Sequence, residues 1–174
     1  MKKQGLFTLA VAVLLYGLPH AAAAQENDYL VGGIGAFNFI EKKDPSAEGR
    51  IEYAPGFRIL GLGTYFRGVG PMVGLMGNTD GGVFGYGGIF GDIRLGERVV
   101  VRPRVGLGGY REGDSRHLGG VFQFHLGVDL AYRFDNDHRL GVMFAHISNA
   151  SVHESNPGTN SLLVTYAIPL GSIF

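Results

Sequence analysis

A histidine and a serine stand two residues apart near the end of the chain, in the run GVMFAHISNA at residues 141–150. The apolar residues around them are typical of a β-strand, where residues i and i+2 share one face and lie roughly 6–7 Å apart. At that spacing the imidazole of His146 could reach the hydroxyl of Ser148. A hydroxyl beside a positioned base is the minimum for an activated oxygen nucleophile, so the chemistry depends on where the strand places this pair.

The first 24 residues have the features of a secretory signal peptide. Two lysines open the chain, residues 6–18 are almost entirely apolar, and Ala22–Ala24 offers a small-residue cleavage site before Gln25. The apolar run is too short for a comfortable membrane helix. We therefore expect an exported protein with one mature domain over residues 25–174.

The composition excludes several classes of function. The 30 glycines in 174 residues are well above the average of about 7%, and they interrupt apolar runs as in tight barrel walls. There is no cysteine, which excludes disulfides and thiolate metal sites. The formal net charge is zero, so nothing indicates a nucleic-acid partner. His153 and Glu154 are adjacent but lack further spaced ligands, so we expect no metal and no cofactor.

Eight segments of alternating hydrophobicity predict eight strands. They cover residues 29–40, 50–60, 67–78, 82–94, 97–111, 117–134, 138–149 and 160–170. In the sixth, one face is aromatic and aliphatic from Phe122 to Phe134, while the other carries Gln123, His125 and Asp129, which suggests a packed polar interior. This alternation fits both a soluble sandwich and a membrane barrel that turns its apolar face to lipid.

Three features favour the membrane barrel. Segments of about 10–12 residues suit a tilted membrane span. The last segment alternates toward a terminal Phe174, which resembles an outer-membrane assembly signal. Short links alternate with longer polar ones at 41–49 and 150–159, as inner turns alternate with outer loops. The sequence therefore predicts an all-β fold, an eight-stranded antiparallel transmembrane β-barrel of the Gram-negative cell outer membrane, with residues 150–159 outside the cell.

This topology places the histidine–serine pair at the outer end of the seventh strand. Arg139 and every second residue up to Asn149 would face the lumen, whereas Phe144, His146 and Ser148 would face lipid. Asn160 on the next strand would face the same way, across the hairpin. An ester hydrolase with this layout would take a substrate lying in the outer leaflet.

The motifs HISNA at 146–150, NPG at 156–158 and YAIP at 166–169 resemble the PagL-type lipid A 3-O-deacylases. The resemblance implies an eight-stranded outer-membrane barrel that removes the ester-linked acyl chain at the 3-position of lipid A, using a Ser-His-Glu triad. Carried over by position, Ser148 is the nucleophile and His146 the base. Asn149 and the backbone after it would lie where the oxyanion is held.

The third member of the triad departs from the family pattern, because the glutamate position is Asn160 here. An amide can accept the imidazole N–H, as in Cys-His-Asn proteases, but it offers no charge to the imidazolium. Three interpretations stay open: slow catalysis with Asn160, substitution by Glu154 of the same loop, or a degenerate barrel without catalysis.

The main alternative function is a non-catalytic structural barrel. An esterase acting on phospholipid is a further one, which the outer-rim placement disfavours. The expected partners are lipopolysaccharide, through its lipid A, and the outer membrane; the oligomeric state, a homodimer included, stays open. The outer-loop cations Lys42, Lys43, Arg111 and Arg116 could contact lipid A phosphates, but their acidic neighbours favour plain solvation.

Overall fold

The computed structural model describes residues 24–41 and 45–172. The predicted signal peptide, apart from Ala24, and the terminal Phe174 lie outside the described residues, so both stay predictions. Within the described ranges, the one helix is the short 3-10 turn η1 (Leu170–Ser172). No helix in this part of the chain is long and apolar enough to cross a membrane.

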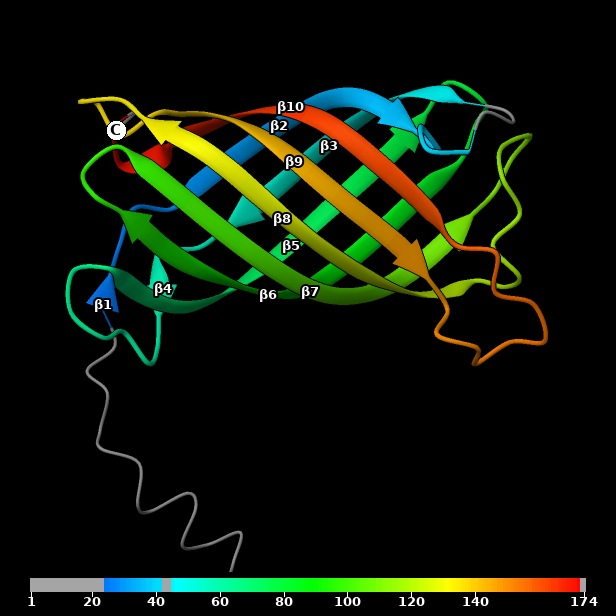
Figure 1. Cartoon of the computed structure of the whole chain (residues 1–174), viewed down its shortest axis with the longest axis horizontal. Helices are drawn as coiled ribbons and strands as arrows, with labels where there is room; N and C mark the ends of the chain where they lie inside the picture. The colour runs from blue at the N-terminus through cyan, green and yellow to red at the C-terminus, as the bar shows by residue number, and fades with distance from the viewer. Residues whose placement is uncertain (1–23, 42–44, 173–174) are drawn as a thin grey trace, which may run out of the picture.

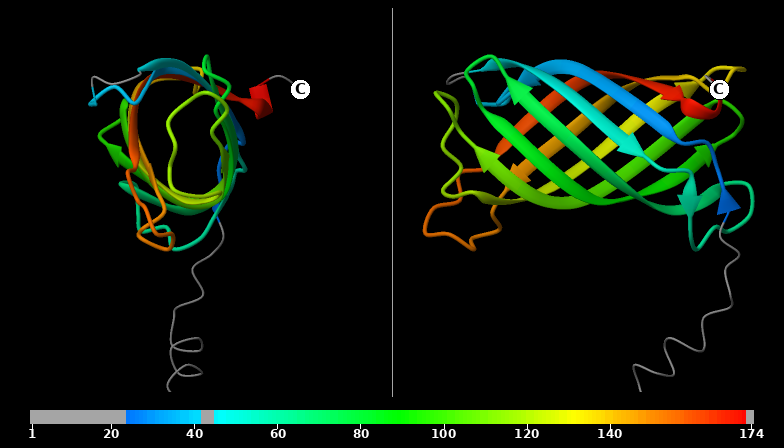
Figure 2. Two further views of the ribbon diagram at one scale, coloured as in Figure 1. Left: turned by 90° about the vertical axis from the view of Figure 1, so that its right-hand side faces the viewer. Right: turned by 180° about the vertical axis from the view of Figure 1, so that it is seen from behind.

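Eight antiparallel strands close into a barrel, seen from the side in Figure 1 and end-on in Figure 2. They are β2 (Tyr29–Phe37), β3 (Ser46–Ala54), β5 (Phe66–Asn78), β6 (Val83–Leu95), β7 (Val99–Arg111), β8 (Phe122–Arg133), β9 (Arg139–Ser148) and β10 (Thr159–Pro169). Each strand pairs with its neighbour in the chain, and β10 closes the ring by pairing with β2. The predicted eight-stranded antiparallel barrel is confirmed.

The predicted second strand is wrong in its bounds. It runs over Ser46–Ala54 rather than 50–60, because Pro55 has no N–H to donate to a sheet. The chain then leaves the barrel wall and forms β4 (Phe57–Arg58), which pairs with β1 (Ala24–Gln25). This small two-stranded sheet lies at the end of the barrel that also carries the C-terminal turn (Figure 1).

Two other predicted strands are too long. The first ends at Phe37 rather than at 40, because Asn38 turns the chain with a positive φ of 57°. The sixth begins at Phe122 rather than at 117, because the residues before it fold over the mouth of the barrel. In both cases the apolar alternation continues in the sequence past the point where the strand ends.

The alternation along the strands separates an apolar outer wall from a polar interior. On β9, Leu140, Val142 and Phe144 are exposed, whereas Arg139 and Met143 are buried. An apolar wall around a polar interior is the arrangement of a membrane barrel. The soluble sandwich that the alternation also allowed is thereby excluded.

Paired ionic groups fill the barrel interior. Arg50 donates to Glu48 at 2.7 Å, and Arg104 donates to Glu52 at 2.7 Å. His125 is fully buried, with its Nε2 2.8 Å from Arg50 Nη1. Gln123 and Asp129 are buried as well, so the polar interior expected around His125 is confirmed.

The end of the barrel beside β1 and β4 is filled by an arginine. The side chain of Arg58 is fully buried and its guanidinium lies 4.4 Å from the centroid of the Phe90 ring. Arg102 stacks on the same ring at 4.0 Å. Gly70 makes room for this packing, since a Cβ there would lie 2.5 Å from Arg58 Nη1.

The opposite end carries the two segments that surround the histidine–serine pair, the β7–β8 loop (112–121) and the β9–β10 loop (149–158) (Figure 1). Leu118 of the β7–β8 loop is 1% exposed and belongs to the core cluster, together with Tyr110 and Ile147. The Asp114 N–H also donates to Asp80 O at 2.8 Å. The β7–β8 loop is therefore anchored from both sides across the barrel mouth.

Candidate active site

The outer end of β9 presents His146 and Ser148 on the outside of the barrel. Both are half-buried, while Ala145 before them and Ile147 between them are buried in the interior. This exposure pattern confirms that the two side chains share the outward face. The link that follows, 149–158, lies at the barrel end opposite β1, as the parity of the strands predicted (Figure 1).

The β9–β10 hairpin brings Asn160 to His146. The two residues are directly opposite in the register, and His146 Nδ1 lies 2.9 Å from Asn160 Oδ1. An amide oxygen only accepts hydrogen bonds, so Nδ1 carries the proton in this arrangement. Nε2 of the neutral ring then holds the free lone pair, which is the tautomer that a general base needs.

A glycine lies against the other edge of the imidazole. Gly158 has a φ of +60°, and a Cβ there would lie 3.1 Å from His146 Cε1 and 3.5 Å from Nε2. Glycine adopts this left-handed conformation without penalty. The turn therefore closes tightly over the ring while leaving the Nε2 edge free of any side chain from position 158.

Ser148 shares the face of His146 but is not locked to it. Within the described segments, its hydroxyl has no hydrogen-bond partner, and Phe124 of β8 lies directly opposite it. Catalytic hydrogen bonds are often long in the absence of substrate and tighten when it binds. The arrangement thus leaves the Ser148 hydroxyl unengaged on the face that carries the base.

The Asn149 side chain is bonded inside the loop, which leaves it no free donor for the oxyanion role that the resemblance suggested. Its side chain is fully buried, and Nδ2 donates to Leu118 O at 2.8 Å and to Ser155 O at 2.7 Å. Its Oδ1 accepts from the Ser151 N–H at 2.9 Å. These bonds occupy the amide completely, so the side chain anchors the β9–β10 loop and has no donor left for an oxyanion.

The backbone after Asn149 is unusual. Ala150 and Ser151 have φ values of 50° and 62°, a left-handed conformation that is costly for residues with a Cβ. The Ala150 N–H has no hydrogen-bond partner within the described residues. Strained backbone of this kind concentrates at functional sites, so this N–H is a candidate oxyanion donor.

A second candidate donor, Asn156, escaped the sequence reasoning. Its Oδ1 accepts from the Asn149 N–H at 2.9 Å, so the amide is held beside the peptide that joins Ser148 to Asn149. Its Nδ2 has no partner within the described segments, and it carries two donors. The position of this residue in the NPG motif was the one available signal.

Glu154 lies apart from this arrangement. The residue is exposed in the β9–β10 loop, and the Nδ1 atom that it would have to hold is already bonded to Asn160. The structure therefore pairs His146 with Asn160, places Ser148 on the same outward face as His146, and leaves Glu154 exposed in the loop.

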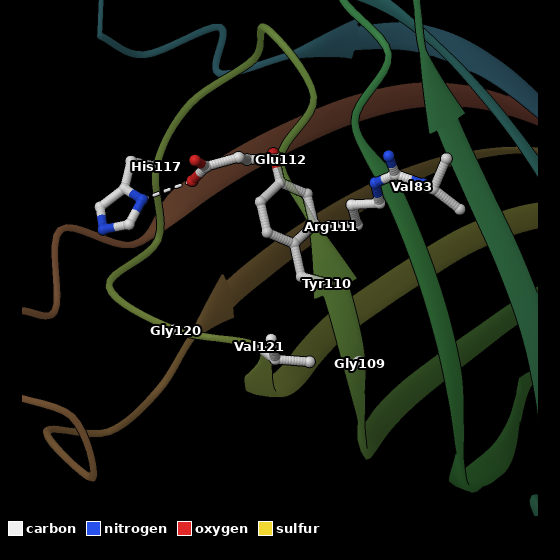
Figure 3. A pocket seen from close by; sticks show the side chains of 8 residues that line it. All are labelled: Val83, Gly109, Tyr110, Arg111, Glu112, His117, Gly120 and Val121. Atoms are coloured by element: carbon white, nitrogen blue, oxygen red, sulfur yellow. Dashed lines mark hydrogen bonds and ion pairs between the residues drawn. The ribbon is translucent and has the colours of Figure 1, made fainter.

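A depression of about 700 Å³ opens on the outer wall beside the end of β7 (Figure 3). It is lined by Val83, Gly109, Tyr110, Arg111, Glu112, His117, Gly120 and Val121. His117 pairs with Glu112 across it, while Arg111 has no ion-pair partner in the described part of the chain. Phe122 lies directly opposite Gly109 and Phe124 opposite Ser148, so these two rings separate the depression from the serine.

A family model and a curated relative that match this chain both carry the description of a lipid A deacylase. The family model described as lipid A 3-O-deacylase (PagL) matches residues 60–169. The lipid A deacylase PagL of Bordetella bronchiseptica is 29% identical over 73 residues. That segment spans 41% of this chain and 41% of the relative's length.

Two solved structures have the same fold. A crystal structure of the outer membrane enzyme PagL superposes with a TM-score of 0.62 at 15% identity, covering 81% of this chain and 99% of that one. A de novo designed transmembrane β-barrel gives a TM-score of 0.51 at 12% identity, covering 83% and 95% of the two chains.

Proposed function

Because the chain belongs to the lipid A 3-O-deacylase (PagL) family, we propose that it is an outer-membrane ester hydrolase that removes the 3-O-linked acyl chain of lipid A. The observation that carries this proposal is the 2.9 Å contact between His146 Nδ1 and Asn160 Oδ1, with Ser148 on the same outward face. The site lies at the loop end of the lipid-facing wall, where a membrane lipid could present an ester bond.

In the proposed reaction, Ser148 Oγ attacks the ester carbonyl carbon while His146 Nε2 takes the hydroxyl proton. The tetrahedral oxyanion collapses, the bond between the carbonyl carbon and the sugar oxygen breaks, and the imidazolium returns its proton to that oxygen. Water then attacks the acyl group on Ser148 and gives its proton to His146. The fatty acid leaves as Oγ regains the proton.

The oxyanion is assigned to the Ala150 N–H, two residues after Ser148, and to the Asn156 Nδ2 group, both of which lack a partner among the described residues. The Asn149 side chain is left out, since its amide is fully engaged inside the loop. Its role in the proposal is to hold the residues that follow it in their left-handed turn.

Asn160 takes the place of the triad acid in this proposal. Its Oδ1 fixes the tautomer of His146. Fixing the tautomer is the larger of the two roles of a triad acid, because an acid-to-amide change in a serine protease lowers turnover by about 10⁴ through the wrong tautomer. The missing charge leaves the imidazolium less stabilised. We therefore propose an active enzyme with a reduced turnover, in which Glu154 takes no part.

The proposal is tested by mass spectrometry of lipid A from Gram-negative cells that make the protein, beside cells that make Ser148→Ala. Loss of one hydroxyacyl chain with the original sequence alone is the expected result. Identical spectra, with both proteins shown by heat-modifiable migration to be folded in the outer membrane, would favour the non-catalytic barrel instead. The proposed enzyme acts as a single chain, with lipid A as its partner.

A further inference from the structure

We infer that Arg116 is a positioning residue of this site, which holds the Pro157–Gly158 turn against the ring of His146 without touching the substrate. The inference rests on the proposed function and names a residue outside the three motifs. Arg116 belongs to the β7–β8 loop, and the turn belongs to the β9–β10 loop.

The guanidinium of Arg116 connects three segments that are far apart in the sequence. Its Nε donates to Gly158 O at 2.7 Å, and one terminal nitrogen lies 3.4 Å from Pro157 O. The other terminal nitrogen pairs with Glu41 at 2.5 Å. Each nitrogen of the planar fork thus has an acceptor, which is an arrangement that arginine makes and lysine cannot.

The turn held by Arg116 is the one that encloses the base. Gly158 lies against the Cε1–Nε2 edge of His146, and Asn160, two residues later, accepts from Nδ1. Fixing the Gly158 carbonyl therefore fixes both neighbours of the imidazole. Because Asn160 is neutral and holds the ring by an uncharged hydrogen bond, the orientation of the base depends more on this turn than it would with a carboxylate.

The loop that carries Arg116 is held in place by contacts on both sides of this residue. Leu118, two residues later, is buried in the core and its carbonyl accepts from Asn149 Nδ2 at 2.8 Å. Two residues before Arg116, the Asp114 N–H is bonded to Asp80 O. The Tyr110 hydroxyl also donates to the Arg116 carbonyl at 3.0 Å, so the backbone on both sides of the guanidinium is tied down.

These contacts remove Arg116 from the set of outer-loop cations that could meet lipid A phosphates. Its side chain is 17% exposed, and its nitrogens are engaged with protein oxygens. Arg111, in contrast, lies exposed at the depression with no ion-pair partner among the described residues. Arg111, the last residue of β7, is therefore a matched control, because it is a nearby cation without a link to the turn.

The test compares Arg116→Met, Arg116→Lys and Glu41→Gln with Arg111→Met, all purified and folded in detergent. One assay is hydrolysis of lipid A, and the other is the rate at which a small soluble fluorophosphonate labels Ser148. The probe has no lipid phosphate, so its labelling reports the activated serine alone.

We expect Arg116→Met to lower kcat roughly 10- to 100-fold, the loss caused by a small misplacement of a catalytic group, with KM within about twofold of the original and an equal fall in labelling rate. Arg116→Lys should recover little, Glu41→Gln should show a smaller fall of the same kind, and Arg111→Met should label normally.

Three outcomes would overturn the inference. The first is an unchanged kcat in Arg116→Met. The second is a higher KM in Arg116→Met with a normal labelling rate, which would make Arg116 a contact for the lipid substrate. The third applies if Arg116→Met fails to fold: normal labelling of Ser148 in both Arg116→Lys and Glu41→Gln would then overturn the inference. An original protein that neither labels nor hydrolyses would refute the proposed function itself, and is thereby distinguishable.

Discussion

Replacing Asn160 by aspartate tests the central feature of the site, because it changes charge and almost nothing else. Asn and Asp have the same shape, so the 2.9 Å contact with His146 Nδ1 should be retained with a carboxylate oxygen in place of the amide oxygen. Asn160 is only half-buried, and the new charge keeps part of its hydration. We expect Asn160→Asp to fold normally and to hydrolyse lipid A faster than the original protein.

The expected gain in kcat follows from the strength that a negative charge adds to the hydrogen bond with His146. A neutral hydrogen bond contributes about 1 kcal/mol and one to a charged group about 1.5–3 kcal/mol. The difference appears as the imidazolium forms, so it lowers the barrier by about 1 kcal/mol, or roughly fivefold in kcat. A gain near 10⁴ is not expected, because Asn160 Oδ1 already selects the productive tautomer.

The assay is release of fatty acid from lipid A by purified protein. Asn160→Ala is the opposite control and should lose activity, while Glu154→Gln should leave it unchanged. A slower Asn160→Asp together with a slower Glu154→Gln would refute the reasoning and make Glu154 the residue that orients the base.

Three further predictions concern residues around and below the site. Gly158→Ala should lower the free energy of unfolding by roughly 1 kcal/mol, because alanine is strained at this left-handed φ. It should also lower kcat, because the new Cβ contacts His146; thermal unfolding and enzyme kinetics in detergent measure the two effects. Asn149→Ala should destabilise the folded barrel by about 3 kcal/mol, since it leaves buried carbonyls unpaired; a fully stable variant with a large loss of kcat would instead support the oxyanion role first expected for this side chain. Glu52→Gln should cost about 3–5 kcal/mol in the same unfolding assay, because Arg104 would lose its buried counter-charge, while the kcat of the folded fraction should be unchanged.

The barrel and the outward face of the pair were predictable from the sequence because both follow from a period of two. Once Arg139 faces the interior, His146 and Ser148 must face outward, and a hairpin of this length places Asn160 beside them. The same parity already put Asn149 on the inner face. Its assignment to the oxyanion came from the resemblance alone, and the burial of its side chain follows the parity instead.

Contacts between loops could not be predicted in this way. The bonds from Arg116 to Pro157 and Gly158 join segments about 40 residues apart, and no periodic pattern connects them. The start of β8 was missed for the same reason. Leu118 continues the apolar alternation of the sequence but is buried in the barrel mouth as part of a loop, so tertiary packing rather than local pattern ends the strand.

The filled interior of the barrel has a consequence for the membrane in which it would lie. An eight-stranded barrel has room inside for side chains and little else. Here the ion pairs at its centre, Leu118 at one end and Arg58 at the other occupy that room. Reconstituted into a planar bilayer, the protein should conduct no measurable ionic current, so a cell could carry many copies without opening its permeability barrier to salts or antibiotics.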